Sequence, residues 1–202
     1  LFSATMSSEV RRIAKRYMRA FEEVAVGPVN SAAAAIQHQY AVVQSKDRYA
    51  ALKRFIDADP ELFGIVFCRT KHETQDLATA LVKDGYNADA IHGDLSQAQR
   101  DHVMGRYRAR TIRLLIATDV AARGIDVKDV THVFHFDLPG EAENYTHRSG
   151  RTGRAGRAGI SLSIIGVRDM NKIRQLERVL KTHFTYVRVP GGAEIVKQQV
   201  KA

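Results

Sequence analysis

Short apolar, β-branched runs recur along the chain, and stretches with helical spacing separate them. The runs cover residues 36–43, 64–68, 88–91, 113–117, 132–136 and 160–165. Strands that alternate with helices indicate βαβ units, right-handed crossovers and a largely parallel sheet. Near-continuous apolar runs, such as the one before Thr118, are typical of strands that helices cover on both faces. We therefore expect an α/β fold in which helices flank a largely parallel sheet on both faces.

The two ends of the chain depart from this alternation. Ser7 and Ser8 precede an acidic residue and predict a helix over residues 7–20, followed by a short apolar strand over 24–26. The Gly-Pro step at residues 27–28 and the alanines that follow favour a linker. After Pro190 a glycine pair breaks the pattern before a short tail in which another helix could begin. Because the first residue is not methionine, we expect the chain to begin inside a longer protein.

Composition narrows the class of protein. A chain of 202 residues is long enough for one well-filled domain with an appended segment, or for two small domains. A net charge of +9 and a pI near 9.8 favour a polyanionic partner, most often nucleic acid, although some soluble basic proteins bind none. The single cysteine, Cys68, lies in an apolar run, cannot form an internal disulfide and fits a reducing cytoplasm. No apolar run approaches the ~20 residues of a membrane span, so we expect no membrane partner.

Small polar and basic residues follow three of the predicted strands. Arg69 and Thr70 follow the strand over 64–68, Gly93 follows the strand over 88–91, and Thr118-Asp119 follows the strand over 113–117. Ligands of open parallel sheets bind at the carboxyl ends of the strands. Hydroxyls and exposed backbone amides at such turns can hydrogen-bond phosphate oxygens. The alternative is that Thr70, Asp94 and Thr118 only cap helices.

Two further segments could add to such a site. Gln97 and Arg100 are three residues apart and would share one helix face near the turn at Gly93, although most pairs of this kind are solvated surface. In the segment over residues 121–126, Gly124 permits a turn or a close approach to a ligand. Asp126 then offers a carboxylate that could accept hydrogen bonds from ribose hydroxyls, or that could only organise the turn.

The run from His147 to Arg157 carries arginines at every third position, with glycines between them. Arginine stays charged and presents a planar fork to phosphate. Arg151 and Arg154 could face one way and hold a terminal phosphate, as arginine fingers do in phosphoryl transfer. The alternative is a solvated basic turn.

These segments together resemble the C-terminal RecA-like domain of DEAD-box RNA helicases, over roughly residues 36–182. Residues 3–5 (Ser-Ala-Thr) resemble the family's motif III, and residues 66–70 resemble motif IV. Gln97 and Arg100 match its Gln-x-x-Arg motif. Residues 117–126 match motif V and residues 147–154 match motif VI. Ser149, at a position that is often apolar in the family, is a departure, as is the Cys68-Arg69 pair in motif IV.

The resemblance implies a RecA-like three-layer sandwich and a role for each matching position. Contacts to the backbone of single-stranded RNA are expected from Thr70, Gly93, Gln97, Arg100, Thr118 and Arg123, and Asp119 is counted with them. A further phosphate contact from Arg69 is a separate hypothesis, which Arg69→Ala would contradict if it left RNA affinity and its salt dependence unchanged. Binding of ATP is expected from Gly124, Asp126, Arg151 and Arg154, with the two arginines acting as catalytic fingers on the γ-phosphate. Coupling between domains is expected from Ser3, Thr5, His147 and Arg148, and Arg148 is also expected to brace the motif V loop.

The same resemblance implies partners for this chain. No Gly-x-x-x-x-Gly-Lys-Ser/Thr loop and no Asp-Glu-Ala-Asp run occurs in the sequence, so an N-terminal RecA-like domain is expected to hold most of ATP and Mg²⁺. Residues 1–30 are interpreted as the end of that domain plus the linker, residues 31–188 as the C-terminal domain, and residues 189–202 as the start of an extension. Residues 1–26 would expose apolar surface without their native domain and could pack against a second copy of the chain or elsewhere on this domain.

Three functions remain in competition at this stage. The first is half of a cytoplasmic, ATP-dependent RNA helicase that is inactive alone. A related DNA helicase or translocase is the second, against which the wording of motifs V and VI argues. The third is a standalone RNA-binding module, which would need neither Arg151 nor Arg154.

Overall fold

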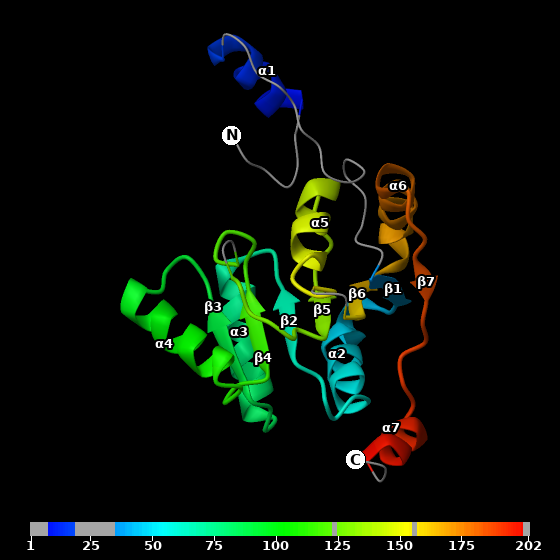
Figure 1. Cartoon of the computed structure of the whole chain (residues 1–202). Coiled ribbons are helices and arrows are strands. Elements are labelled where there is room, and N and C mark those ends of the chain that lie inside the picture. Colours follow the sequence, from blue (N-terminus) through cyan, green and yellow to red (C-terminus); the bar gives the residue numbers. More distant parts are fainter. Residues whose placement is uncertain (1–7, 19–34, 123–124, 155–156, 200–202) are drawn as a thin grey trace.

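The computed structural model describes residues 8–18, 35–122, 125–154 and 157–199 (Figure 1). The strands are β1 (Ile36–Val42), β2 (Gly64–Phe67), β3 (Ala88–Ile91), β4 (Leu114–Ala117), β5 (His132–His135), β6 (Gly159–Ile165) and β7 (Thr185–Tyr186). The α-helices are α1 (Ser8–Tyr17), α2 (Arg48–Asp57), α3 (Lys71–Lys83), α4 (Gln97–Arg108), α5 (Ala142–Ser149), α6 (Met170–Leu180) and α7 (Gly192–Gln199). Short 3-10 segments, η1 (Ser45–Asp47) and η2 (Val167–Asp169), precede α2 and α6.

The strands form one seven-stranded sheet in the order β3-β4-β2-β5-β6-β1-β7. Every neighbouring pair is parallel. The largely parallel sheet expected from the sequence is therefore confirmed. Because all strands run the same way, the turns after β2, β3 and β4 meet at one edge of the sheet.

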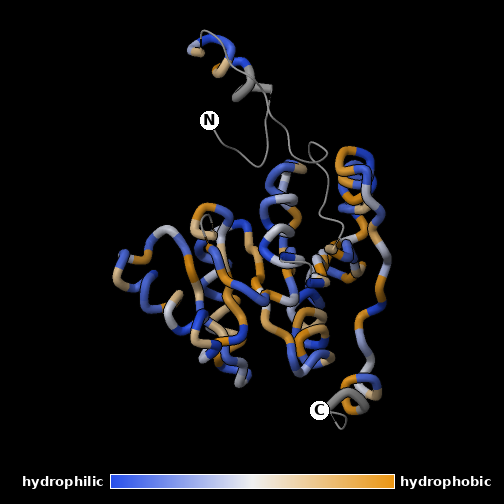
Figure 2. Tube along the Cα trace, in the orientation of Figure 1, coloured by the Kyte–Doolittle hydropathy of each residue, from blue (hydrophilic) through white to orange (hydrophobic). Residues whose placement is uncertain are grey.

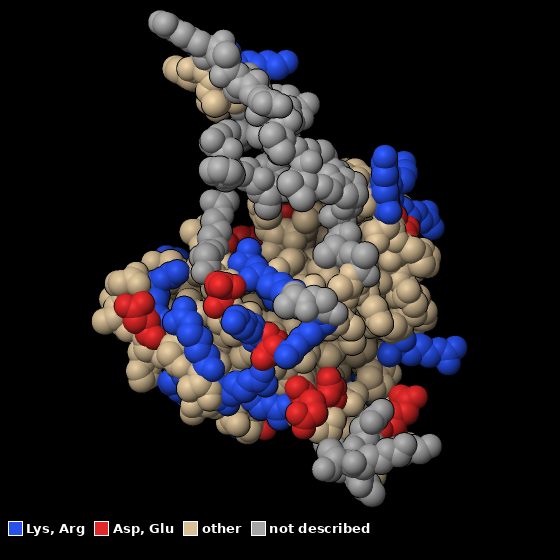
Figure 3. Space-filling model, viewed as in Figure 1, with Lys and Arg blue, Asp and Glu red and all other residues tan. Residues whose placement is uncertain are grey.

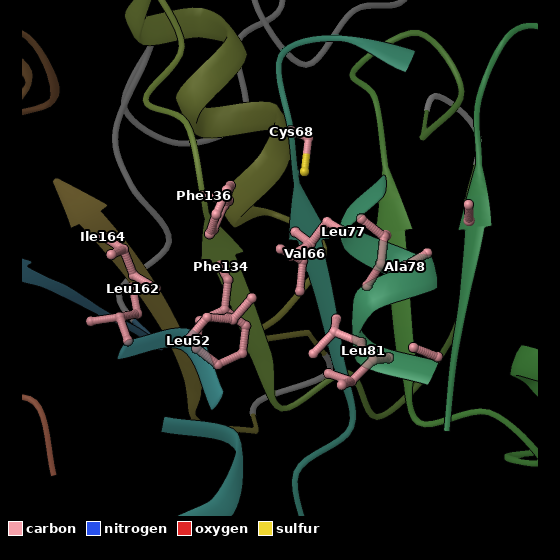
Figure 4. Packing of buried hydrophobic residues seen from close by; sticks show 14 of the residues in the cluster. Leu52, Val66, Cys68, Leu77, Ala78, Leu81, Phe134, Phe136, Leu162 and Ile164 are labelled. Carbon is pink, nitrogen blue, oxygen red and sulfur yellow. The ribbon is translucent and has the colours of Figure 1, made fainter. Parts of the chain in front are cut away.

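Helices cover both faces of the sheet, so the three-layer α/β sandwich is also confirmed. On one face α2 and α3 pack on the sheet, where Leu52 and Leu81 meet Val66 and Phe134 in a buried cluster (Figure 4). On the other face α4 contributes Tyr107 to a second buried cluster, while α5 and α6 contribute to a third. Strands β2 and β4 are buried at every position, and hydrophobic residues predominate in both (Figure 2).

Several local features differ from the sequence expectations. The edge strand β7 was not predicted, because its two residues are exposed and carry no apolar pattern. The basic run, for which a solvated turn was the alternative interpretation, begins in the last turn of α5, which ends at Ser149. Helix α1 stands apart from the layers and exposes Ile13 and Tyr17 (Figure 1). The expected strand over residues 24–26 and the linker before Ala35 lie outside the described residues, and the proposed domain boundaries stay predictions.

Candidate functional site

The turn after β2 carries Arg69 and Thr70 at the carboxyl edge of the sheet. Thr70 is the N-cap of α3, and its side-chain oxygen accepts a hydrogen bond from the Glu73 amide at 3.2 Å. Thr70 therefore does cap a helix, as the alternative interpretation proposed. Its exposed hydroxyl still has one lone pair and its hydrogen for a ligand. The Arg69 amide donates to Asp137 Oδ2 at 3.2 Å, while its guanidinium is 70% exposed.

A pair of carboxyl groups lies directly behind this turn. Asp137 follows β5, is buried, and accepts a hydrogen bond from Arg48 Nη2 at 3.1 Å. Burial, together with the neighbouring Asp137 carboxylate, raises the pKa of Glu73 to about 7. Burial opposes ionisation of Asp137 as well, but its hydrogen bond with Glu73 and the charge of Arg48 hold its pKa below the usual value. Of the two carboxyl groups, Glu73 is therefore the one that binds a proton more readily, and Asp137 is the carboxylate that orders the turn.

The turn after β3 leads into α4. Gly93 is exposed, and a Cβ placed on it would meet no atom within 4 Å. Asp94 caps no helix, because it pairs with Lys71 at 2.8 Å and the cap of α4 is Ser96. Gln97 donates to Asp101 at 2.8 Å and remains exposed at the start of the helix.

Arg100 connects α4 to the turn after β4. Its Nη2 donates to the carbonyl of Ala121 at 3.1 Å, so the guanidinium reaches across to motif V. Thr118 is half-buried in that turn, and its carbonyl, rather than its hydroxyl, accepts from the Ala122 amide at 2.9 Å. The predicted residues of the Gln-x-x-Arg motif and of motif V are thus adjacent in space.

Arg148 of α5 connects the turn after β4 to the segment that follows β5. Its guanidinium holds the Asp119 carboxylate through two bonds, Nε to Oδ1 at 2.5 Å and Nη2 to Oδ2 at 2.7 Å. The remaining Nη1 donates to the backbone carbonyl of Asp137 at 2.6 Å, and the ring of Phe67 lies 5.1 Å from the guanidinium carbon. The Arg148 side chain is only 3% exposed. This contact is the brace of motif V expected from Arg148, and it engages the Asp119 oxygens that were assigned to RNA.

The two predicted fingers lie beyond the end of α5, near Asp126. Arg154 Nη1 is 2.7 Å from Asp126 Oδ1, and its Nε donates to the carbonyl of Gly150 at 2.8 Å. Arg151 Nη1 donates to the carbonyl of Ile125 at 2.7 Å. Burial lowers the pKa of Arg151, and the Arg154 charge lowers it further against the opposing effect of Asp126. Motifs V and VI therefore bring together all the described residues assigned to ATP.

The segment between α5 and β6 is fixed by close backbone packing. The buried Thr152 hydroxyl donates to the carbonyl of Thr131 at 3.1 Å, which joins motif VI to the start of β5. Gly153 has a φ of +68°, a conformation that favours glycine. A Cβ on Gly159 would collide with Thr152 and with the backbone nitrogen of Gly153. These two glycines let the chain that follows α5 pack closely against the start of β6.

A buried polar network underlies α5. Ser149 Oγ lies 2.9 Å from Ser161 Oγ, which also contacts His135 Nε2 at 3.0 Å and Tyr145 Oη at 3.0 Å. Tyr145 in turn contacts His38 Nδ1 at 2.8 Å. Ser149 thus has hydrogen-bond partners that an apolar residue could not use, which accounts for the departure from the family pattern.

Some of the predicted residues cannot be placed. Ser3, Thr5, Arg123 and Gly124 lie outside the described residues, and their roles stay predictions. His147 is half-buried in the last turn of α5, beside Arg148. Asp137 was missed as a site residue, although it directly follows the strand expected over 132–136 and the strand-end rule applied elsewhere would have found it.

The face shown in Figure 3 carries basic side chains over the middle of the domain, with acidic side chains interspersed. Among the described residues no group of three or more His, Cys, Asp or Glu side chains could hold a metal ion. In the same part of the chain no helix is long and apolar enough to cross a membrane.

Comparison with known proteins agrees with this arrangement. The family described as Helicase conserved C-terminal domain matches residues 47–156, which include motifs V and VI. The chain belongs to this family. Within it, the chain corresponds to the C-terminal RecA-like domain of DEAD-box proteins.

Relatives of this helicase domain are considerably longer than the chain. DEAD-box ATP-dependent RNA helicase CshA of Geobacillus kaustophilus is 42% identical over 98% of the chain and 43% of the relative. The crystal structure of a DEAD box protein from Methanococcus jannaschii is 44% identical, with a TM-score of 0.72 over 93% of the chain and 50% of its own. Dbp5 of S. cerevisiae bound to RNA and ADP BeF3 is 29% identical, with a TM-score of 0.88 over 100% of the chain and 54% of its own. The helicase domain thus spans about half the length of the proteins it matches.

Proposed function

We propose that this chain is the C-terminal half of an ATP-dependent DEAD-box RNA helicase. It binds the backbone of single-stranded RNA and supplies Arg151 and Arg154 to an ATP held by an N-terminal RecA-like domain. Closure of the two domains around both ligands then separates short RNA duplexes locally.

The contact between Arg154 and Asp126, at 2.7 Å, carries this proposal. One residue comes from motif V and the other from motif VI, and each was assigned to ATP independently. Asp126 is 85% exposed and Arg154 is 37% exposed, so a ligand approaching from solvent reaches both side chains. The carboxylate offers an acceptor for ribose hydroxyls and the guanidinium offers donors for phosphate, and the match of both residues to motifs V and VI supports assigning them to ATP.

RNA is assigned to the other group of residues, at the carboxyl edge of the sheet. Thr70, Gly93 and Thr118 follow three adjacent strands there, and phosphate contacts at such turns carry no base sequence. Arg148 connects the assigned RNA site to the assigned ATP site, because it lies in α5 and the chain that follows α5 carries Arg151 and Arg154. Its contacts to Asp119 and to the Asp137 carbonyl connect RNA-side turns to the nucleotide side.

In this proposal an N-terminal RecA-like domain holds Mg²⁺ and most of the ATP. The length of the relatives leaves room for it, and Mg²⁺ is assigned to it because the family's Asp-Glu-Ala-Asp run does not occur in this sequence. We assign Ser3 and Thr5, with His147, to the interface between the halves, and the whole protein to the cytoplasm. Residues 1–26 would pair two copies of the isolated chain, and a monomer in which residues 1–26 resist proteolysis would contradict that pairing.

RNA-stimulated ATP hydrolysis by the protein with both halves tests the proposal. Arg154→Ala is expected to lower the turnover number by about 10³-fold, the effect of losing an arginine finger. The matched control is Arg157→Ala, which removes an exposed guanidinium of the same run that pairs with Asp129. Equal activity of the Arg154 and Arg157 variants would overturn the finger assignment.

The same assay separates the competing functions. The 202-residue chain alone is expected to hydrolyse no ATP but to bind RNA. Stimulation of the two-domain protein by single-stranded DNA as strong as by RNA would favour a DNA helicase or translocase. RNA binding without any stimulated hydrolysis would favour a standalone binding module.

A further inference from the structure

A hollow of about 660 Å³ opens at the carboxyl edge of the sheet, beside the turn after β2. It lies at the ends of β1, β5 and β6, between the segments that start α2 and α6. The side chains that matter for its chemistry are Gln44, Ser45, Arg48, Arg69, Arg168 and Lys172. We refer to it as the strand-end hollow; none of the roles assigned above uses it, apart from Arg69 on its rim.

The strand-end hollow carries an excess of positive charge. Four basic residues line it against two carboxylates, those of Asp137 and Asp169. The carboxylates are engaged: Asp137 holds Arg48 at 3.1 Å, and Asp169 holds Lys172 at 2.8 Å. Each engaged carboxylate neutralises one of the four cations, so two guanidiniums remain in excess.

These two guanidiniums are Arg69 and Arg168. Arg69 lies 3.9 Å from Asp137 Oδ1, a distance too long for a hydrogen bond. Arg168 is exposed and makes no ion pair with any residue that the structure describes. Both therefore retain donors in the fork geometry that matches phosphate, at the mouth of one hollow.

The lining indicates which part of a nucleic acid would enter. Among the described residues that line the strand-end hollow none is aromatic, so they offer no ring on which a base could stack. Hydroxyl, amide and guanidinium donors remain, in Ser45, Gln44 and Arg168, and these suit phosphate and sugar oxygens. Arg69 belongs both to the hollow and to motif IV, where it precedes Thr70, so the hollow continues the assigned RNA edge without a break.

We propose that the strand-end hollow binds a phosphate of the RNA strand as it extends past the turn after β2, with Arg168 as the principal new contact. This inference rests on the proposed RNA-binding function and adds a subsite to it. The contact is with the backbone, so it lengthens the bound strand without adding base specificity.

Equilibrium binding of uridine oligomers to the 202-residue chain, followed by fluorescence anisotropy, tests the subsite. Two lengths are compared, about 12 and about 5 nucleotides, the shorter being too short to reach both Gly93 and the hollow. Arg168→Ala is expected to weaken binding of the longer oligomer about tenfold, as loss of a charge-assisted hydrogen bond does. Its slope of log affinity against log salt is expected to fall by about 0.7, one phosphate contact on a single strand.

Arg174→Ala is the matched control. Arg174 is an exposed arginine of α6 that does not line the strand-end hollow, so its loss removes the same charge from the same part of the surface. We expect this variant to bind both oligomers as the parent does, and Arg168→Ala to leave the short oligomer unaffected.

Each other outcome has a definite meaning. Equal losses for the Arg168 and Arg174 variants, or an equal loss for short and long RNA, would assign Arg168 to general attraction and overturn the subsite. If the parent chain binds RNA and Arg168→Ala changes nothing, the subsite fails while the proposed function stands. A parent chain that binds no RNA of either length would overturn both.

Discussion

Arg154 and Asp126, which are 28 residues apart in the sequence, form an ion pair with Nη1 2.7 Å from Oδ1. In the proposed function both side chains contact ATP, one at the γ-phosphate and the other at the ribose. They cannot do so while bonded to each other, because these groups lie at opposite ends of the nucleotide. If both proposed roles hold, nucleotide binding has to separate the pair before Arg154 can contact the γ-phosphate.

Asp126→Ala is accordingly expected to weaken ATP binding to the two-domain protein about tenfold, since a hydrogen bond to a charged group is lost. The variant should also lose any preference for ATP over a nucleotide without ribose hydroxyls, which competition binding measures. Asp76→Ala, on the exposed face of α3, removes the same charge and should change neither quantity. An Asp126 variant that still discriminates between the two nucleotides would show that the carboxylate does not contact the ribose.

The pair of Arg148 and Asp119 predicts an asymmetric effect on stability. Arg148 is 3% exposed and Asp119 is 37% exposed. Asp119→Ala leaves a buried guanidinium without its carboxylate and should lower the free energy of unfolding by about 3 kcal/mol. Arg148→Met removes the buried charge itself and should cost about 2 kcal/mol, because the Asp119 carboxylate can recover water.

The double variant Asp119→Ala/Arg148→Met should then be more stable than Asp119→Ala alone, which urea unfolding measures. Lys172→Ala and Asp169→Ala provide the comparison, since their exposed pair should contribute at most about 1 kcal/mol. Strict additivity of the two single effects at 119 and 148 would contradict the buried-pair interpretation.

Substitution of Gly159 tests how closely motif VI packs against the start of β6. A methyl group there would collide with Thr152 and with the backbone of Gly153, so Gly159→Ala should destabilise the fold by about 2 kcal/mol. Gly105, inside α4, has no atom within 4 Å of an added Cβ. Gly105→Ala should instead stabilise by about 0.5–1 kcal/mol, through a more restricted unfolded chain. Two substitutions of equal effect would indicate that motif VI is not packed as described.

The buried side chain of His38 predicts that the free energy of unfolding falls at acid pH. Burial lowers the pKa of His38 to about 4, against about 6.5 for an unfolded histidine. The unfolded chain therefore binds the extra proton first as the pH falls. The stability contributed by the neutral His38 is fully present above about pH 6.5 and is lost as the pH falls toward about 4.

His38→Phe should flatten the loss of unfolding free energy between these pH values, by up to about 3 kcal/mol at the acid end. Tyr145 would keep its hydrogen bond to Ser161, so the packing under α5 should survive. The parent chain, unfolded over the same pH range, is the reference. An unaltered slope for His38→Phe would show that His38 is not the group that titrates.

Patterning along the sequence was sufficient to predict the layers. Runs such as residues 114–117, apolar at every position, have few stable environments other than a strand covered on both faces. Helical spacing between these runs then required crossovers and hence parallel strands. The two-residue strand β7 was not predicted from the sequence. Its exposed residues have no apolar pattern of their own and form a strand only by pairing with β1.

The sequence by itself determined the fold class and the residues available for binding, because spacing and side-chain chemistry are local properties. Only the tertiary structure decided which of these residues meet. Asp119, assigned to RNA, is held by a buried guanidinium from α5, and Arg154 lies on Asp126 instead of projecting freely. The sequence pattern did not single out Asp137, Glu73 or Arg168. Their roles follow from neighbours that are distant in the sequence. Ion pairing and burial depend on distances in space, and spacing along the chain does not contain those distances.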